Sequence, residues 1–315
     1  MTDRNLQSKN RTKTGSNLLL GLAALIWGVA FVAQSVGMEY VGAFTFNGCR
    51  FLIGGAVLLP LIGAMRGRRA KGPGEGSWWK REKTGITGGL CCGAVLFVAS
   101  SFQQFGVAET TVGKAGFITA LYIVIVPLLG IFLKKKIPWS VWVSVALATV
   151  GMYLLCMTEG LKISRGDIYV FLCAVCFSFH ILIIDYFSPR ADGVMISCVQ
   201  FFTAGVLSAL AAVILETPKL SSMAAAWAPI LYAGIMSCGV GYTLQVVAQK
   251  NTDPVLASLI LSLESAFSLL AGWVILGQKL SPKELGGCVL VFAAIILAQI
   301  PAKNAGQGKA SEQNA

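Results

Sequence analysis

Apolar residues fill this chain in long uninterrupted runs separated by short polar segments. Each run is about twenty residues long, the length an α-helix needs to cross the hydrocarbon core of a bilayer. The alternating segments of about ten residues that build membrane β-barrels are absent from the sequence. The runs therefore predict ten membrane-spanning helices, at about 17–36, 41–65, 84–105, 110–133, 139–158, 167–187, 194–215, 226–248, 253–276 and 284–300.

Composition points the same way. The chain has 315 residues, of which 56% are hydrophobic and only 12% are charged, and its mean hydropathy is +0.73. These values are typical of a polytopic membrane protein, and the ten runs leave no stretch from which a soluble domain could be built. The predicted fold class is an all-α membrane protein.

Basic residues account for a net charge of +11. They lie in the short segments between runs, where they act as topology signals, so we expect no nucleic-acid partner. With the N-terminus inside, eighteen of the 25 Lys and Arg fall on the inner side and five on the outer side. This predicts a multi-pass protein of the plasma (inner) membrane with cytoplasmic tails at 1–16 and 301–315. The N-terminal tail is expected to be disordered. Segment 66–83 is the strongest cytoplasmic marker.

An internal repeat is visible when the two halves are compared. Residues 111–138 and 253–282 share a small-residue segment, a long apolar run, a lysine-bearing turn and a proline before the next run. The halves, 17–158 and 166–300, would hold five spans each. Because five is an odd number, the second half must insert upside down relative to the first, as in many secondary transporters.

Several stretches also resemble a known family. They are LIWGVAFVAQSVGM, FTFNGCRFLIGG, SSFQQFGVAETTVGKAGFITALYIVIVPLL and YTLQVVAQKNTDPVLASLILSLESAF. Together they are similar to the EamA-type members of the drug/metabolite transporter superfamily, over roughly 17–300. The resemblance implies a plasma-membrane transporter that moves small metabolites by alternating access, with the substrate cavity between the repeats.

The function predicted from these observations is secondary-active export of small metabolites such as amino acids, with protons as a candidate coupling ion. The partners are then a small-molecule substrate and the lipid bilayer, and assembly into a homo-oligomer is left open. The sequence contains no nucleotide-binding loop, catalytic triad or metal-ligand spacing, so no cofactor or metal is expected. Two alternatives are an enzyme embedded in the membrane that acts on lipid-like substrates, and a membrane scaffold that transports nothing.

Glu264 is the first candidate site residue. It lies about eleven residues into the ninth run, close to the middle of the bilayer, where an acidic residue costs about 2.5–3.5 kcal/mol to insert. Such a residue needs a partner charge, a water-filled cavity or a protonation cycle. Glu264 is therefore either a proton or cation site, or a structural acid paired with Arg50 or Lys114.

Three basic side chains within the runs each have two interpretations. Arg50 can bind a substrate carboxylate or phosphate, although an ion pair that ties two helices together is favoured. Lys114 can line a cavity, although an extension to the outer surface is favoured because it lies near the end of its run. His180, the single histidine, can relay protons, although a buried neutral ring bonded to a neighbour is favoured.

Amides and aromatic rings complete the candidate site. An unsatisfied amide in hydrocarbon costs several kcal/mol, so the amides of the apolar runs must face protein or water, where they suit a polar or zwitterionic substrate. The rings can line a cavity or pack in the core. The candidates are Gln34, Gln103, Gln245, Trp27, Tyr122 and Tyr242.

Overall fold

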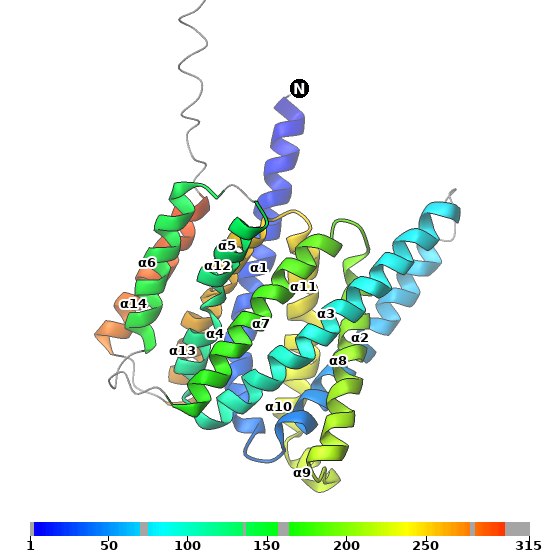
Figure 1. Ribbon diagram of the computed structural model, residues 1–315, viewed down its shortest axis with the longest axis vertical. Coiled ribbons are helices and arrows are strands. Elements are labelled where there is room, and N and C mark those ends of the chain that lie inside the picture. Colours follow the sequence, from blue (N-terminus) through cyan, green and yellow to red (C-terminus); the bar gives the residue numbers. More distant parts are fainter. Residues whose placement is uncertain (1–2, 70–74, 135–136, 157–163, 278–280, 300–315) are drawn as a thin grey trace, which may run out of the picture.

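The structure is a computed structural model that describes residues 3–69, 75–134, 137–156, 164–277 and 281–299. Within these ranges every regular element is a helix (Figure 1). The helices, in chain order, are α1 (Asp3–Gly37), α2 (Ala43–Arg69), α3 (Glu75–Glu109), α4 (Val112–Thr119), α5 (Tyr122–Phe132), α6 (Trp139–Cys156), α7 (Arg165–Phe187), α8 (Gly193–Leu215), α9 (Leu220–Ala225), α10 (Trp227–Leu231), the π-helix η1 (Tyr232–Tyr242), α11 (Thr243–Gln249), α12 (Pro254–Leu261), α13 (Leu263–Leu276) and α14 (Pro282–Gln299).

Eight helical segments of the described residues are long and apolar enough to cross a membrane. Two further apolar helices, Trp139–Leu154 and Leu285–Ala298, coincide with the expected fifth and tenth runs and are shorter. The eight are Thr14–Gly37, Ala43–Met65, Glu82–Glu109, Val112–Phe132, Arg165–Phe187, Gly193–Leu215, Trp227–Gln249 and Pro254–Ile275.

Polarity is arranged as lipid requires. Apolar side chains such as Val213 and Ile214 are 75% and 76% exposed, whereas the polar side chains of Asn47, His180 and Gln200 are completely buried. A protein in water would show the opposite tendency. The outer surface therefore suits a hydrocarbon solvent, and the polar groups are collected inside a multi-pass membrane protein.

The helices form one bundle (Figure 1). The helix α3 packs on α7 and α8, α2 packs on α8 and η1, and α1 packs on α13, η1 and α11, while α6 and α14 pack on each other at the left edge of the view. Small residues permit the close contacts. A Cβ atom at Gly28 of α1 would lie 2.4 Å from the Cβ of Phe267 and 2.8 Å from the backbone nitrogen of Ser268, both in α13.

Two of the expected spans are interrupted near their middle. The span expected at 110–133 is divided into α4 and α5, and the span at 253–276 into α12 and α13. At the second break the hydroxyls of Ser262 and Ser265 donate to the carbonyl oxygens three residues earlier, at 2.7 Å each. Serine hydroxyls thus add hydrogen bonds to backbone oxygens at the break, which helps to make an interrupted helix tolerable in a membrane.

A third expected span, at 226–248, contains the π-helix η1 between α10 and α11. A π-helix has i→i+5 hydrogen bonds and holds more residues per turn than an α-helix; it arises from an inserted residue and is frequent at functional sites. Eleven residues in this form are an unusually long stretch. The wide turn places the carbonyl oxygen of Ser237 where Trp27 of α1 donates to it, at 3.2 Å.

The N-terminal segment differs from expectation. We expected residues 1–15 to be disordered, but α1 already begins at Asp3. A helix that is nucleated by a long membrane span extends at little cost, because each added residue gains one hydrogen bond. Residues 300–315, which contain the expected C-terminal tail, lie outside the described residues.

The carboxylate of Glu216, the residue after α8, covers the first turn of α2. It accepts hydrogen bonds from the backbone nitrogens of Phe44 and Thr45, both at 2.9 Å, and from the Thr45 hydroxyl at 2.6 Å. A Cβ at Gly42 would lie 2.3 Å from the Glu216 carboxyl carbon, so the approach requires glycine there. An acid from the second half of the chain thus satisfies the free N–H groups of a helix in the first half.

Candidate functional site

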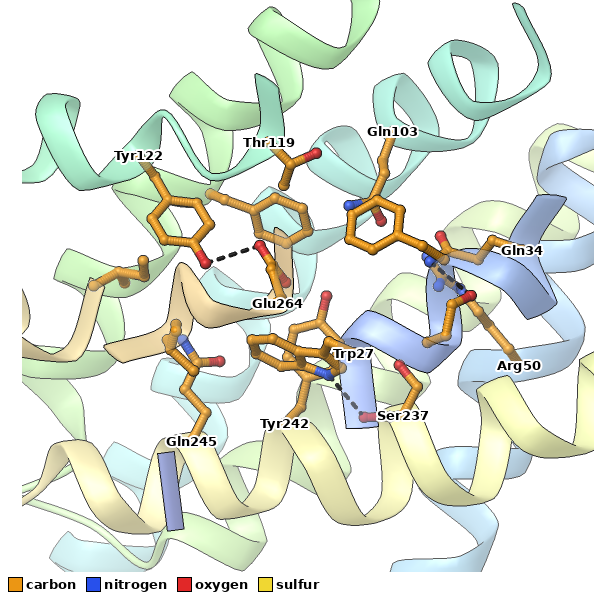
Figure 2. Close-up of a pocket in the computed structure, with 15 residues that line it drawn as sticks. Trp27, Gln34, Arg50, Gln103, Thr119, Tyr122, Ser237, Tyr242, Gln245 and Glu264 are labelled. Carbon is orange, nitrogen blue, oxygen red and sulfur yellow. Dashed lines mark hydrogen bonds between the residues drawn. The ribbon is translucent and has the colours of Figure 1, made fainter. Parts of the chain in front are cut away.

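A cavity opens at the centre of the bundle, with about 450 Å³ of empty space between its lining atoms and mouth. Its walls come from α1, α2, α3, the broken pairs α4/α5 and α12/α13, α7, η1 and α11. Eight of the candidate residues line it: Trp27, Gln34, Arg50, Gln103, Tyr122, Tyr242, Gln245 and Glu264 (Figure 2).

Glu264 is the acid of this cavity. It is the second residue of α13, directly after the break, and is 4% exposed. The hydroxyl of Tyr122 donates to its Oε1 at 2.8 Å, as the dashed line in Figure 2 marks. Within the part of the chain that the structure describes, Glu264 makes no ion pair with Arg50 or Lys114. The carboxyl group is therefore held by a neutral donor and faces the cavity.

Arg50 is the base of the cavity. It extends from α2, is 1% exposed and lies over two aromatic rings, with its guanidinium carbon 4.7 Å from the Phe51 ring centroid and 5.8 Å from that of Phe46. Its Nε and Nη2 atoms have no hydrogen-bond partner among the described residues. A buried guanidinium with unused donors is costly, which points to an occupant of the cavity that accepts those bonds.

Aromatic rings form one wall. The rings of Trp27 and Tyr242 lie 4.5 Å apart between centroids, tilted by 53°. Trp27 is held by its bond to the Ser237 carbonyl oxygen, and Tyr242 lies between Phe201, at 5.9 Å, and His180, at 6.0 Å. These contacts hold the two rings in fixed positions. A rigid aromatic wall of this kind can contact an apolar or aromatic part of a ligand.

The amides differ in how they are satisfied. Gln34 donates to the carbonyl oxygen of Ala30 at 3.3 Å, and its own Oε1 has no partner in the part of the chain that the structure describes. Gln245 also has an unpartnered Oε1, and both residues line the cavity. Buried amide oxygens without a donor are rare in folded proteins unless water or a ligand supplies one. These groups can therefore hydrogen-bond to a polar molecule in the cavity.

Two candidates lie outside the cavity lining. Lys114 forms an ion pair with Asp167 of α7 at 2.6 Å, and Thr110 donates to the same carboxylate at 3.0 Å. His180 lies behind Tyr242, completely buried, with its Nε2 3.1 Å from Oε1 of Gln200. Lys114 thus ties α4 to the start of α7, while His180 lies behind two rings that line the cavity, those of Phe177 and Tyr242.

Sequence reasoning missed some lining residues. Ala30, Thr119 and Ser237 line the cavity but have no unusual chemistry for a membrane helix. Thr119 closes α4, at the break that also positions Tyr122, and the apolar pattern does not reveal this break. Ser237 depends on the π-helix, which the apolar pattern does not reveal. Ala30 had no signal at all.

The chain is similar to several known proteins. A sequence model of the EamA-like transporter family matches residues 15–157 and 164–299. A protein of Archaeoglobus fulgidus named as an uncharacterized transporter is 31% identical over 286 residues, which are 90% of this chain and 86% of the relative. Another uncharacterized transporter, from Clostridium kluyveri, is 26% identical over 259 residues, which are 78% of this chain and 80% of the relative.

The fold is also known from a solved structure, described only as the crystal structure of a protein. It has a TM-score of 0.70 and 21% sequence identity, and the match covers 91% of this chain and 96% of the other. An all-helical membrane fold around a buried polar cavity is the architecture of a multi-pass membrane transporter. The chain belongs to the EamA-like transporter family.

Proposed function

We propose that this protein is a secondary-active transporter that exports small metabolites such as amino acids by alternating access. The observation that carries the proposal is a buried acid, Glu264, and a buried base, Arg50, which has no counter-ion among the described residues; both line one cavity at the centre of a membrane bundle. Ionisable groups at that depth are expensive, and their usual role is to bind a substrate or an ion on its way across.

The architecture in this proposal is ten spans in two inverted five-span halves, 17–158 and 166–300. The helix contacts support it. A repeat requires that each contact between two spans has a counterpart between the matching spans of the other half. The α3–α7 contact corresponds to η1–α1, the α3–α8 contact to η1–α2, and the α1–α13 contact to α4–α7. All six contacts exist. In Figure 1, α1 descends from the marked N-terminus, whereas α7 ascends before α8 descends to α9.

Matched positions in the two halves also contact each other. Phe51 and Phe201 are the ninth residues of α2 and α8, and their rings stack with 6.2 Å between centroids. Tyr122 and Glu264 are the eleventh residues counted from the starts of α4 and α12, and they share the hydrogen bond described above. A two-fold axis through the cavity explains both pairs, and a site on such an axis is what alternating access requires.

The proposed setting is the plasma (inner) membrane with both termini in the cytoplasm, which the distribution of Lys and Arg favours. The proposed coupling ion is the proton, and the proposed carrier is Glu264. A carboxyl group held by the neutral hydroxyl of Tyr122 can lose and regain a proton without breaking an ion pair.

Flux in sealed proteoliposomes tests the function. The full chain is reconstituted, and uptake of a metabolite panel, including the twenty standard amino acids, is compared with and without an imposed pH gradient. We expect gradient-driven accumulation of at least one compound. The Glu264→Gln variant should lose accumulation, and Glu39→Gln, which changes an exposed carboxylate in the turn after α1, should keep it.

The outcomes separate the alternatives. Accumulation that survives in Glu264→Gln would remove the proton role from this residue and leave transport standing. Chemical turnover of a lipid-like compound in detergent, without flux, would favour an enzyme. Absence of both flux and turnover would favour a scaffold.

A further inference from the structure

The two halves differ at two matched positions, which line the cavity in the first half only, and this difference deepens the proposed function, on which the inference rests. Ala30 and His180 both lie seven residues before the ends of α1 and α7, and Arg50 and Gln200 are both the eighth residues of α2 and α8. At these positions the first half has an alanine and an arginine, where the second half has a histidine and a glutamine.

In the second half these two side chains contact each other, although Nδ1 of His180 and Nε2 of Gln200 have no hydrogen-bond partner among the described residues. The His180 ring lies against Gln200, with 3.1 Å between Nε2 and Oε1, and meets the rings of Phe177 and Tyr242 edge to face at 6.2 and 6.0 Å. Both His180 and Gln200 have no exposed surface, and neither lines the cavity. The cavity therefore does not reach these two side chains.

In the first half the same positions are open. Ala30 offers only a methyl group, so nothing corresponds to the imidazole, and both Ala30 and Arg50 line the cavity. The guanidinium is fixed over the Phe51 ring, while Nε and Nη2 have no partner among the described residues. These two nitrogens belong to the planar fork with which arginine binds oxyanions in a bidentate manner.

We propose that Arg50 is the oxyanion subsite of the cavity, and that Ala30 determines specificity by leaving space for the oxyanion. The ligand class is a small molecule with a carboxylate or a phosphate, which neutralises the guanidinium during transport. The acid of Glu264 lines the same cavity and is available to a cationic or hydrogen-bonding part of the ligand. A cation without an oxyanion would leave Arg50 uncompensated and would be rejected.

Matched ligand pairs test the subsite. The probes are L-phenylalanine and phenethylamine, L-leucine and 3-methylbutylamine, succinate and 1,4-butanediol, and glycerol 3-phosphate and glycerol. The purified full chain in detergent is titrated with each, and the rise in Tm gives an apparent Kd. We expect at least one oxyanion to stabilise the protein while its counterpart does not. The carboxylate and phosphate arms identify which oxyanion the site takes.

Variants assign the effect to these residues. Arg50→Gln copies the second half and should weaken oxyanion binding at least tenfold, Arg50→Lys should retain part of it, and Ala30→His should abolish it by filling the space. Arg190→Gln removes an exposed guanidinium at the end of α7 and should bind as the unchanged protein does. The Tm of each variant without ligand reports its folding, and Arg50→Lys and Ala30→His carry the test if Arg50→Gln does not fold.

The proposal is overturned if counterparts stabilise as well as the oxyanions, if no probe stabilises the protein, or if folded Arg50 and Ala30 variants bind normally. Transport is judged separately. Flux of phenethylamine or glycerol that is unaffected by Arg50→Gln would remove the oxyanion subsite and keep the transporter, whereas the absence of any flux would count against the function itself.

Discussion

At the scale of single residues, the Tyr122 hydroxyl is the donor that holds Glu264. Both groups are buried, so removal of the hydroxyl leaves a carboxyl oxygen without a partner, at a cost of about 1–3 kcal/mol. We expect Tyr122→Phe to lower the Tm and to alter the pH dependence of flux. The measurements are thermal unfolding in detergent and proteoliposome uptake across a pH series.

Tyr153→Phe is the matched control, because that tyrosine is exposed on α6. It should change neither quantity. A Tyr122→Phe variant with unchanged Tm and an unchanged pH profile would mean that the hydrogen bond has no role in stability or coupling.

The ion pair of Lys114 and Asp167 gives a second prediction. Asp167 also accepts from Thr110 and from the backbone nitrogen of Ser164, so its carboxylate satisfies three groups, and their loss leaves several partly buried donors free. We expect Asp167→Ala to lower the Tm clearly more than Lys114→Met does. The difference between the two variants in the free energy of unfolding should be about 1–3 kcal/mol. Thermal unfolding of both variants checks this order.

The role of Lys114 is decided by the same pair of variants. A purely structural lysine predicts that Lys114→Met retains flux in proportion to the folded protein. Loss of flux at normal Tm would instead return Lys114 to the substrate path.

At the scale of elements, Gly28 fixes how closely α1 approaches α13. A methyl group there would lie within 2.4–2.8 Å of Phe267 and Ser268, including backbone atoms. We expect Gly28→Ala to force the helices apart, to cost about 1–3 kcal/mol and to lower flux, because α13 carries Glu264. Gly21→Ala is the control: nothing lies within 4 Å of its Cβ position, so it should be neutral or slightly stabilising. Equal Tm values for the two variants would contradict the close packing.

The sequence could predict which segments are helices but not where they break. The apolar pattern is continuous through Leu121 and Ser262, so nothing in it distinguishes a broken span from a whole one. It could predict Arg50 and Glu264 as cavity residues, because a charge deep in an apolar run must face something polar. It could not predict that Lys114 meets Asp167, since the rotation of α4 and α7 depends on packing with other helices.

At the scale of the whole molecule, Glu216 joins the two halves at one end of the bundle. Its carboxylate satisfies the first turn of α2 and is only partly exposed. In the proposed orientation this end faces outward. We expect Glu216→Ala to favour the outward-open conformation, because three bonds that hold the outer end together are lost. The reporter is a cysteine introduced at Thr119 in a variant background without reactive cysteines. A membrane-impermeant thiol reagent added from outside should label this cysteine several-fold faster in Glu216→Ala.

Glu109→Ala is the control, because it removes an exposed acid elsewhere in the same bundle. It should leave labelling unchanged. Equal labelling rates for both variants would show that Glu216 is a helix cap without influence on opening.

The π-helix η1 has a consequence for how the two halves diverged. Gln103 and Gln245 are matched positions, because each lies nine residues before the start of the next helix. Gly93 and Gly234 are matched as well, because they approach α8 and α2 in the same manner. Gly93 lies ten residues before Gln103, whereas Gly234 lies eleven residues before Gln245. In the proposed two-repeat architecture, the second half thus carries one additional residue inside a span. A protein built from two identical copies of the first half would lack this additional residue and would offer Trp27 no carbonyl oxygen at Ser237. Its cavity would be symmetric and would present the same chemistry to both ends of a substrate.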